Sequence, residues 1–242
     1  MRVTPIPRRA GCALWLVDLD EPAGAQALAT LSADERARAG RFIFDRDRER
    51  FMAARSALRQ VLASHLGMQP AQLVFTVGTY GKPVLAQLPG CRFNLSHSGR
   101  YGLIALSPQD EVGVDIEILR DMPDALAMAE AHFDAQDAAA LAALPPGQRS
   151  IAFLAAWTRG EACLKALGTG FSGPGLPATG IDLAPRKVQM AVPGTTACTA
   201  RLESFELPEA GAVASLALLD AQARAAAPLH GPRSMMSMAV QA

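Results

Sequence analysis

Two acidic side chains stand two residues apart in the segment 112–117, which reads Val-Gly-Val-Asp-Ile-Glu. Side chains two apart on a strand project to the same face, so Asp115 and Glu117 are expected about 7 Å apart on one face. Paired carboxylates supply the hard oxygen ligands that Mg²⁺ prefers. The segment therefore predicts either a magnesium site or an ordinary half-buried strand with a hydrated acidic face, and spacing alone leaves both open.

A second candidate is the segment 157–165, in which Glu161 and Lys165 stand four residues apart. At helical spacing they share a side with Trp157 and Leu164, which marks that side as largely buried. A buried carboxylate needs a partner. Glu161 is therefore a candidate metal ligand and Lys165 a candidate phosphate contact, although the same spacing also suits an ordinary ion pair on a helix surface.

Two further segments add basic side chains. In 78–83, glycine and proline hold Lys82 on a tight turn, but the spacing is too short for a Walker A loop. In 93–99, Ser96 beside His97 suggests a hydrolase, yet neighbouring side chains on a strand face opposite ways and no G-x-S-x-G elbow exists. His97 is then either a hydrogen-bonded residue at a strand end or a phosphate contact.

Arginines are concentrated between residues 41 and 59, and the set is Arg41, Arg46, Arg48, Arg50, Arg55 and Arg59. Acidic residues alternate with the first of them, which is typical of a solvated helix face. Arg48, Arg55 and Arg59, however, lie at spacings of seven and four, on roughly one face. Because guanidinium groups suit phosphate oxygens, this face is also a candidate phosphate site.

The elements that position these side chains follow from hydrophobic periodicity and turn residues. Strands are expected at 13–20, 72–77, 91–97, 101–107 and 112–118, with weaker signals near 186–192, 196–206 and 212–219. Helices are expected at 32–38, which opens with a capping box, and at 45–67, 124–143 and 149–168. This order predicts an α+β fold with subdomains at 1–118 and 119–220 and a poorly ordered tail at 221–242.

Composition excludes several classes of protein. The chain has 242 residues, a formal net charge of +0 and 50% hydrophobic residues, which rules out a disordered chain and argues against a nucleic-acid binder. It contains no uncharged apolar stretch of about 18 residues, so we expect no membrane span. The four cysteines lie far apart, and the apolar run after Arg9 lacks a cleavage site. We therefore expect reduced thiols and a cytoplasmic protein.

Taken together, four motifs resemble the Sfp type of 4'-phosphopantetheinyl transferase. In chain order they are YGKP at 80–83, FNLSHSG at 93–99, GVDIE at 113–117 and WTRGEACLKALGTGF at 157–171. The resemblance runs from about residue 31 to 171. It implies a pseudo-dimer of two similar α+β subdomains with coenzyme A bound in the cleft between them. It also implies Mg²⁺-dependent transfer of 4'-phosphopantetheine to a serine of an acyl or peptidyl carrier protein, by a monomer.

The resemblance assigns roles to individual positions. Asp115, Glu117 and Glu161 are similar to the Mg²⁺ carboxylates. Glu161, Lys165 and Asp115 form the implied catalytic set, in which Lys165 contacts the pyrophosphate and Glu161 is the candidate acceptor of the serine proton. The positions implied to contact coenzyme A, besides Lys165, are Arg38, Arg50, Arg55, Lys82, Ser96 and His97.

The chain departs from the family pattern W-x-x-K-E at one position, where Gly160 replaces the lysine before Glu161. A positive charge beside the site is lost, and a glycine within a helix costs about 1 kcal/mol relative to alanine. This departure leaves an alternative open, namely a degenerate relative that binds coenzyme A or a carrier protein without efficient transfer. The substitution Gly160→Lys was expected to separate the two hypotheses.

Overall fold

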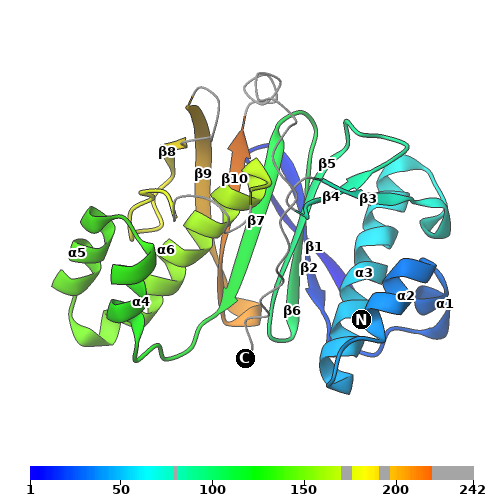
Figure 1. Cartoon of the computed structure of the whole chain (residues 1–242), viewed down its shortest axis with the longest axis horizontal. Helices are drawn as coiled ribbons and strands as arrows, with labels where there is room; N and C mark the ends of the chain where they lie inside the picture. Colours follow the sequence, from blue (N-terminus) through cyan, green and yellow to red (C-terminus); the bar gives the residue numbers. More distant parts are fainter. Residues whose placement is uncertain (79–80, 170–175, 191–196, 220–242) are drawn as a thin grey trace.

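The structure is a computed structural model, and it describes residues 1–78, 81–169, 176–190 and 197–219. Two four-stranded antiparallel sheets lie at its centre, and helices cover their outer sides (Figure 1). The strand order is β1-β2-β6-β5 in the first sheet and β7-β10-β9-β8 in the second. The strands of the first sheet are β1 (Arg2–Arg9), β2 (Cys12–Asp18), β5 (Arg92–Ser98) and β6 (Tyr101–Ser107). Those of the second are β7 (Glu111–Ile118), β8 (Arg186–Met190), β9 (Cys198–Leu207) and β10 (Ala212–Leu219).

Each sheet carries one long helix. In the first half this is α3 (Asp45–Leu66), preceded by α1 (Ala25–Ala29) and α2 (Ala33–Ala39), and a small hairpin of β3 (Phe75–Val77) and β4 (Pro83–Leu85) lies beside it. In the second half it is α6 (Pro146–Leu167), preceded by α4 (Ala125–His132) and α5 (Ala135–Ala143). The pairing of one long helix with one antiparallel sheet in each half agrees with the expected α+β pseudo-dimer. Within the described ranges, no helix is long and apolar enough to cross a membrane.

The core is built in layers because the strands bury both faces. Leu14 and Leu16 of β2 pack against Val114 and Ile116 of β7 between the two sheets. Leu58 of α3 belongs to a separate cluster on the outer face of the first sheet, and a third cluster joins α6 to the second sheet. The sheets are separate hydrogen-bonded units that lie side by side at their edge strands β5 and β7, so this seam joins the two halves.

Some expected elements differ from the observed ones. Strand β1 was not expected, because Pro5 and Pro7 interrupt its pattern; it lies at the edge of its sheet, where proline is tolerated. The single helix expected over 124–143 is two helices, because Asp134 begins α5 by accepting a hydrogen bond from the Gln136 N–H.

The halves also divide at a different point. The expected boundary after residue 118 places the strand 112–118 in the first half, whereas β7 pairs with β10 of the second sheet. The chain therefore crosses from one sheet to the other in the turn after Ser107. The periodicity of β7 could not reveal its sheet, because both faces of this strand are mostly buried. The expected disordered tail at 221–242 lies outside the described residues.

Candidate active site

Strand β7 has three acidic residues, and it presents Asp115 and Glu117 to α6. Val114 and Ile116 fill the core between the sheets, so Asp115 and Glu117 face the other way, as the alternation predicted. Asp115 is only 4% exposed, which contradicts the alternative of a hydrated acidic face at that position. Glu117 is more accessible and accepts hydrogen bonds from Ser98 Oγ at 2.8 Å and Arg120 Nη1 at 2.7 Å.

Helix α6 reaches Asp115 because it lies very close to β7. A Cβ added at Gly113 would overlap the backbone of Ala162 and Ala166, so only glycine allows this approach. As a result, Lys165 Nζ lies 2.5 Å from Asp115 Oδ1 and 4.0 Å from Glu161 Oε2. The two acidic segments singled out in the sequence thus meet around one lysine.

The seam between the halves orients the same carboxylates. Three side chains at alternate positions of β5 reach β7. Asn94 Oδ1 accepts a hydrogen bond from the Val114 N–H at 2.9 Å, and Ser96 Oγ donates to Asp115 Oδ1 at 2.6 Å. Ser98 Oγ donates to Glu117 in the same way and also accepts from the Ile118 N–H. Each carboxylate of β7 is therefore held from the other half of the molecule.

The electrostatics of the cluster favour protonation of its carboxylates. Burial raises the pKa of Glu161 to about 7; the Lys165 ammonium opposes this shift, whereas the charges of Asp115 and Glu117 add to it. Burial also raises the pKa of Asp115, against the effect of the same ammonium. Among the described residues, Asp115 Oδ2 and Glu161 Oε1 are buried without a hydrogen-bond partner. Two buried carboxylate oxygens within the described ranges therefore have no hydrogen-bond partner and are available to a ligand.

These oxygens fit a hard divalent cation in their chemistry. Across the described part of the chain, however, no group of three or more His, Cys, Asp or Glu side chains is arranged to hold a metal ion. The expected set of Asp115, Glu117 and Glu161 is adjacent but not assembled, because Lys165 lies against one carboxylate and Arg120 against another. This ligand set stays a prediction.

The neighbouring Ser96 and His97 do not form a catalytic pair. Ser96 Oγ is engaged with Asp115 and accepts from Lys165 Nζ at 2.9 Å, whereas His97 lies on the opposite face of β5 and is exposed. Desolvation by the surrounding protein, and then the charge of Lys165, lower the pKa of His97. The hydrolase alternative thus loses its nucleophile–base contact, and a neutral imidazole is presented instead.

The expected arginine contacts are divided among different environments. Arg55 and Arg59 both bind Glu35, at 2.6 and 2.7 Å, so neither forms part of an open phosphate face. Arg38 is exposed and stacks on the ring of Phe51. Arg55 and Arg59 thus meet at one carboxylate, whereas Arg48, the third residue of the predicted arginine face, pairs with Asp45.

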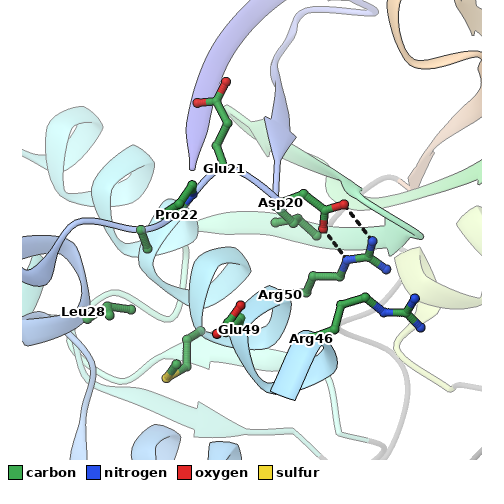
Figure 2. A pocket seen from close by; sticks show the side chains of 10 residues that line it. Asp20, Glu21, Pro22, Leu28, Arg46, Glu49 and Arg50 are labelled. Carbon is green, nitrogen blue, oxygen red and sulfur yellow. Dashed lines mark hydrogen bonds and ion pairs between the residues drawn. The ribbon is translucent and has the colours of Figure 1, made fainter. Parts of the chain in front are cut away.

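Arg50 lies at a cavity of about 420 Å³ between α3 and the chain after β2 (Figure 2). Its guanidinium forms a two-pronged ion pair with Asp20, with atoms 2.5 and 2.8 Å apart, and Arg46 points the same way beside it. Arg50, which is one of the three arginines implied to contact coenzyme A, therefore lines an open cavity.

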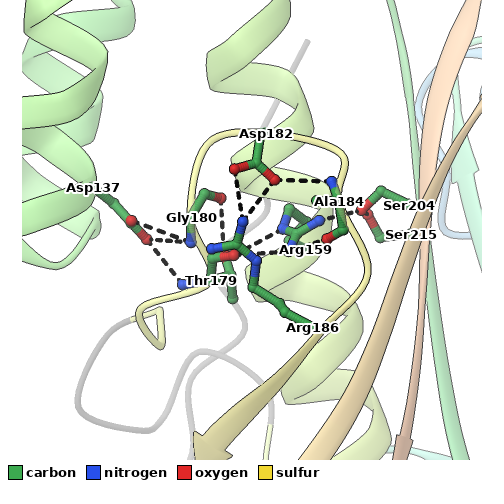
Figure 3. Close-up of polar contacts among 9 residues, drawn as sticks. All are labelled: Asp137, Arg159, Thr179, Gly180, Asp182, Ala184, Arg186, Ser204 and Ser215. Carbon is green, nitrogen blue, oxygen red and sulfur yellow. Dashed lines mark hydrogen bonds and ion pairs between the residues drawn. The ribbon is translucent and has the colours of Figure 1, made fainter.

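Gly160 has a packing role. A Cβ at this position would meet Leu176 Cδ2 at 2.8 Å and Leu176 Cβ at 3.0 Å, so Leu176 occupies the space that a lysine side chain would enter. The next residue back, Arg159, is fully buried; it binds the carbonyl oxygens of Thr179 and Ala184 and the hydroxyl of Ser204 (Figure 3). The segment that contains Leu176, Thr179 and Ala184 is therefore held against α6 at the position where the family has a lysine.

The sequence had shown part of this site. The alternation of Asn94, Ser96 and Ser98 on one face of β5 was a readable signal, since the opposite face carries Phe93 and Leu95. The importance of Gly113 had no such signal, because it depends on how closely α6 approaches.

Comparison with known proteins identifies the family to which the chain is similar. Residues 21–109 match the family model described as 4'-phosphopantetheinyl transferase, N-terminal, and residues 111–213 match the 4'-phosphopantetheinyl transferase superfamily. The two matches meet in the turn between β6 and β7, where the chain passes from one sheet to the other.

Several curated relatives agree. A putative 4'-phosphopantetheinyl transferase of Synechocystis is 41% identical over 162 residues, 66% of this chain and 66% of that protein. The 4'-phosphopantetheinyl transferase HetI of Nostoc is 40% identical over 164 residues, 66% of this chain and 69% of that protein. Sfp of Bacillus subtilis is 29% identical over 147 residues, 61% of this chain and 64% of that protein. The matches thus span about two thirds of these relatives, and the chain belongs to the 4'-phosphopantetheinyl transferase superfamily, a family of transferases.

Proposed function

We propose that this chain transfers the 4'-phosphopantetheine group of coenzyme A to a serine hydroxyl of an acyl or peptidyl carrier protein. The serine oxygen forms a bond to the phosphorus that carries pantetheine, and the bond from that phosphorus to the bridging oxygen of the pyrophosphate breaks. Adenosine 3',5'-bisphosphate leaves, and the serine proton passes to a base. The observation that carries this proposal is the contact of Lys165 with Asp115 beside the unpartnered oxygen of Glu161.

The residues divide the chemistry among them. Lys165 places an ammonium where the negative charge of the leaving phosphate develops. Glu161, whose buried Oε1 has no hydrogen-bond partner among the described residues, is the candidate acceptor of the serine proton. Asp115, Glu117 and Glu161 would hold Mg²⁺, which supplies charge neutralisation to the pyrophosphate when bound. The attacking hydroxyl belongs to the carrier protein, so this chain needs no nucleophile of its own.

The remaining contacts with coenzyme A are proposed from the same arrangement. Arg38 is exposed, and Arg50 lines a cavity where an incoming phosphate would compete with Asp20 for the guanidinium, so both are candidates for the phosphates of the nucleotide end. His97, whose pKa is lowered by desolvation, is a candidate contact beside the carboxylate cluster. Arg55 is bound to Glu35 and is not proposed as a ligand. We further propose that the protein acts as a monomer, because both halves contribute to the site within one chain.

The experiment is intact-mass analysis of a panel of apo carrier proteins incubated with this chain and coenzyme A. The panel includes fatty-acid, polyketide and nonribosomal-peptide carriers, each with a matched variant whose acceptor serine is alanine. We expect a gain of one phosphopantetheine group on at least one carrier, absent from its alanine variant and abolished when EDTA removes Mg²⁺. A mass gain that persists in EDTA would contradict the metal requirement, and no gain on any carrier would contradict transfer.

The alternative of a relative without efficient transfer rested on Gly160. Because Leu176 packs against this glycine, the residue has a structural reason to be present, and it does not by itself argue against catalysis. A parallel calorimetric titration with coenzyme A separates the two functions. Binding of coenzyme A without any mass gain on the panel would favour the degenerate relative.

A further inference from the structure

Lys82 lies directly before β4, in the first half of the molecule. The Gly78 N–H donates to the Lys82 carbonyl oxygen at 2.9 Å, and Pro83 begins β4 directly afterwards. Gly81 has a φ of +90°, which favours glycine at that position. The side chain of Lys82 therefore starts beside the first residue of β4.

That side chain crosses the seam into the second half. Its Nζ lies 2.9 Å from the carbonyl oxygen of Val112, 3.2 Å from that of Ala166 and 3.3 Å from Glu111 Oε2. Only 11% of the side chain is exposed. Removing an ammonium group from water is unfavourable, and the acceptors around Lys82 Nζ offset this desolvation. The resemblance implied that Lys82 contacts the nucleotide, whereas in the structure the Lys82 ammonium contacts acceptors of the protein itself.

The acceptor at Ala166 is a specific one, because it lies in the last turn of α6. The final carbonyl groups of a helix have no intrahelical partner, and the helix end carries partial negative charge. Lys82 therefore caps α6 from outside the helix, while its contacts with Val112 and Glu111 tie the same ammonium to the start of β7. It holds together the two elements that approach most closely at Gly113.

The residue beside Ala166 is Lys165, whose ammonium contacts Asp115 and Ser96. We propose that Lys82 is a positioning residue that clamps the end of α6 to β7 across the seam and thereby fixes where Lys165 stands, rather than a ligand of the nucleotide. The consequence for catalysis rests on the proposed function, since it requires Lys165 to contact the pyrophosphate. The clamp itself does not.

The chain offers an internal test because it contains only three lysines, Lys82, Lys165 and Lys187. Brief acetylation of the native protein, followed by peptide mass analysis, reports the accessibility of each amine with and without coenzyme A. We expect exposed Lys187 to react fastest and Lys82 at least about tenfold more slowly, because its reaction requires local opening. Coenzyme A should protect Lys165 and leave the rate of Lys187 unchanged.

The outcomes separate the clamp from the function. Reaction of Lys82 as fast as Lys187 in the free protein would overturn the clamp. Failure of coenzyme A to protect Lys165 would instead count against the proposed function, and the slow reaction of Lys82 would still support the clamp. This measurement uses the unmodified chain and does not depend on whether a variant folds.

A double-mutant cycle tests the positioning role. The variants are Lys82→Met, Lys165→Met and both together, with Lys187→Met as the matched control on the exposed lysine. If Lys82 acts through Lys165, Lys82→Met lowers kcat more than it raises KM for coenzyme A, and adds less than about twofold to the loss already caused by Lys165→Met. Lys82→Arg, which keeps donors for the carbonyl groups, restores most of kcat.

A direct nucleotide contact gives the opposite pattern. Lys82→Met would then raise KM for coenzyme A, weaken calorimetric binding by a similar factor in either background, and multiply with Lys165→Met. That result would overturn the positioning role. Lys187→Met is expected to leave transfer unchanged in both cases, because its side chain is exposed on β8 of the second sheet.

Discussion

Two buried clusters of carboxylates and cations, one in each half of the chain, differ in how completely they are paired. In the first half, Glu35 binds Arg55 through Oε1 and Arg59 through Oε2, and also accepts a hydrogen bond from the Ser32 N–H. In the second half, Asp115 and Glu161 share one ammonium from Lys165, and each has one buried oxygen without a hydrogen-bond partner in the described part of the chain. The same types of residue thus form a satisfied cluster and an unsatisfied one.

The pKa shifts follow this difference. The partners of Glu35, led by the charge of Arg55, outweigh its burial and lower its pKa. Burial outweighs the single partner of Glu161 and raises its pKa to about 7. A cluster whose polar atoms are all hydrogen-bonded stabilises the fold, whereas a cluster with unpaired buried oxygens can bind a ligand through them. Substitutions in the two clusters should therefore separate stability from activity.

The largest effect is expected from Glu161→Gln, which keeps the shape of the side chain and removes its charge and basicity. Loss of a positioned proton acceptor lowers kcat by about 100- to 10,000-fold. Because a buried, underpaired charge is removed, urea unfolding should show unchanged or increased stability. The matched control is Glu130→Gln on the exposed surface of α4, which should change neither quantity. If Glu161→Gln instead lowered stability and left transfer unchanged, Glu161 would stabilise the fold and would not act in catalysis.

The counterpart in the satisfied cluster is Glu35→Ala. It leaves the fully buried Arg59 guanidinium without its carboxylate, so we expect a loss of about 3–5 kcal/mol in the free energy of unfolding. Urea denaturation measures it, with Asp34→Ala on the exposed side of the same helix as the control. If Glu35→Ala lowers the free energy of unfolding by less than Asp34→Ala does, the ion pairs of Glu35 with Arg55 and Arg59 do not stabilise the fold. Coenzyme A binding by the remaining folded protein should stay close to that of the unsubstituted chain.

Gly160→Lys is expected to act through packing. Its Cβ would meet Leu176, and such overpacking costs about 1–3 kcal/mol. Thermal unfolding should show a lower Tm, and Gly160→Lys combined with Leu176→Ala should recover part of it. A gain in transfer without loss of stability would show that the family lysine is accommodated here after all.

Ser98→Ala should have a smaller effect, because Glu117 keeps its contact with Arg120. The substitution removes two hydrogen bonds, one donated to Glu117 and one accepted from the Ile118 N–H, and each contributes about 0.5–1.5 kcal/mol. We expect a several-fold decrease in kcat/KM and a weakened Mg²⁺ dependence of transfer, while Ser98→Thr, which retains the hydroxyl, should approach the original values. Equal behaviour of the two variants would show that the hydroxyl does not orient Glu117.

The smallest effect is the pH dependence contributed by Glu35. Its pKa is lowered on folding, so its contribution to stability is complete above the ordinary glutamate pKa of about 4.3 and is lost as pH falls through the folded value. Urea unfolding at acidic pH should therefore show a steeper decline for the unsubstituted chain than for Glu35→Ala. Parallel curves for the two proteins would contradict the lowered pKa.

The sequence predicted most elements and the main acidic residues, because alternation and helical spacing report burial directly. It placed Asp115 with Glu117 on one face of β7, and Glu161 with Lys165 on one side of α6. It could not predict which cation neutralises which carboxylate, because that depends on contacts between residues far apart in the chain. Arg55 was assigned to a phosphate for this reason, although Glu35, 20 residues earlier, binds it.

Backbone proximity was equally hidden. Gly113 was part of a recognised motif, but nothing in its spacing showed that α6 passes directly over it. Similarly, Lys82 looked like an exposed lysine on a turn until its acceptors in β7 and α6 were known. Local patterns report what a residue is and which face it occupies, whereas these two roles are set by elements that come later in the chain.

The seam between the halves has a consequence for how this enzyme can be divided. The chain crosses between the sheets only once within the described residues, in the turn between Ser107 and Glu111, and each half has a complete sheet with its own long helix. A cut in this turn would yield two polypeptides, each with an apolar sheet face that requires the other. Because each face is buried by the other in the intact chain, the two separately produced halves are expected to associate again through them.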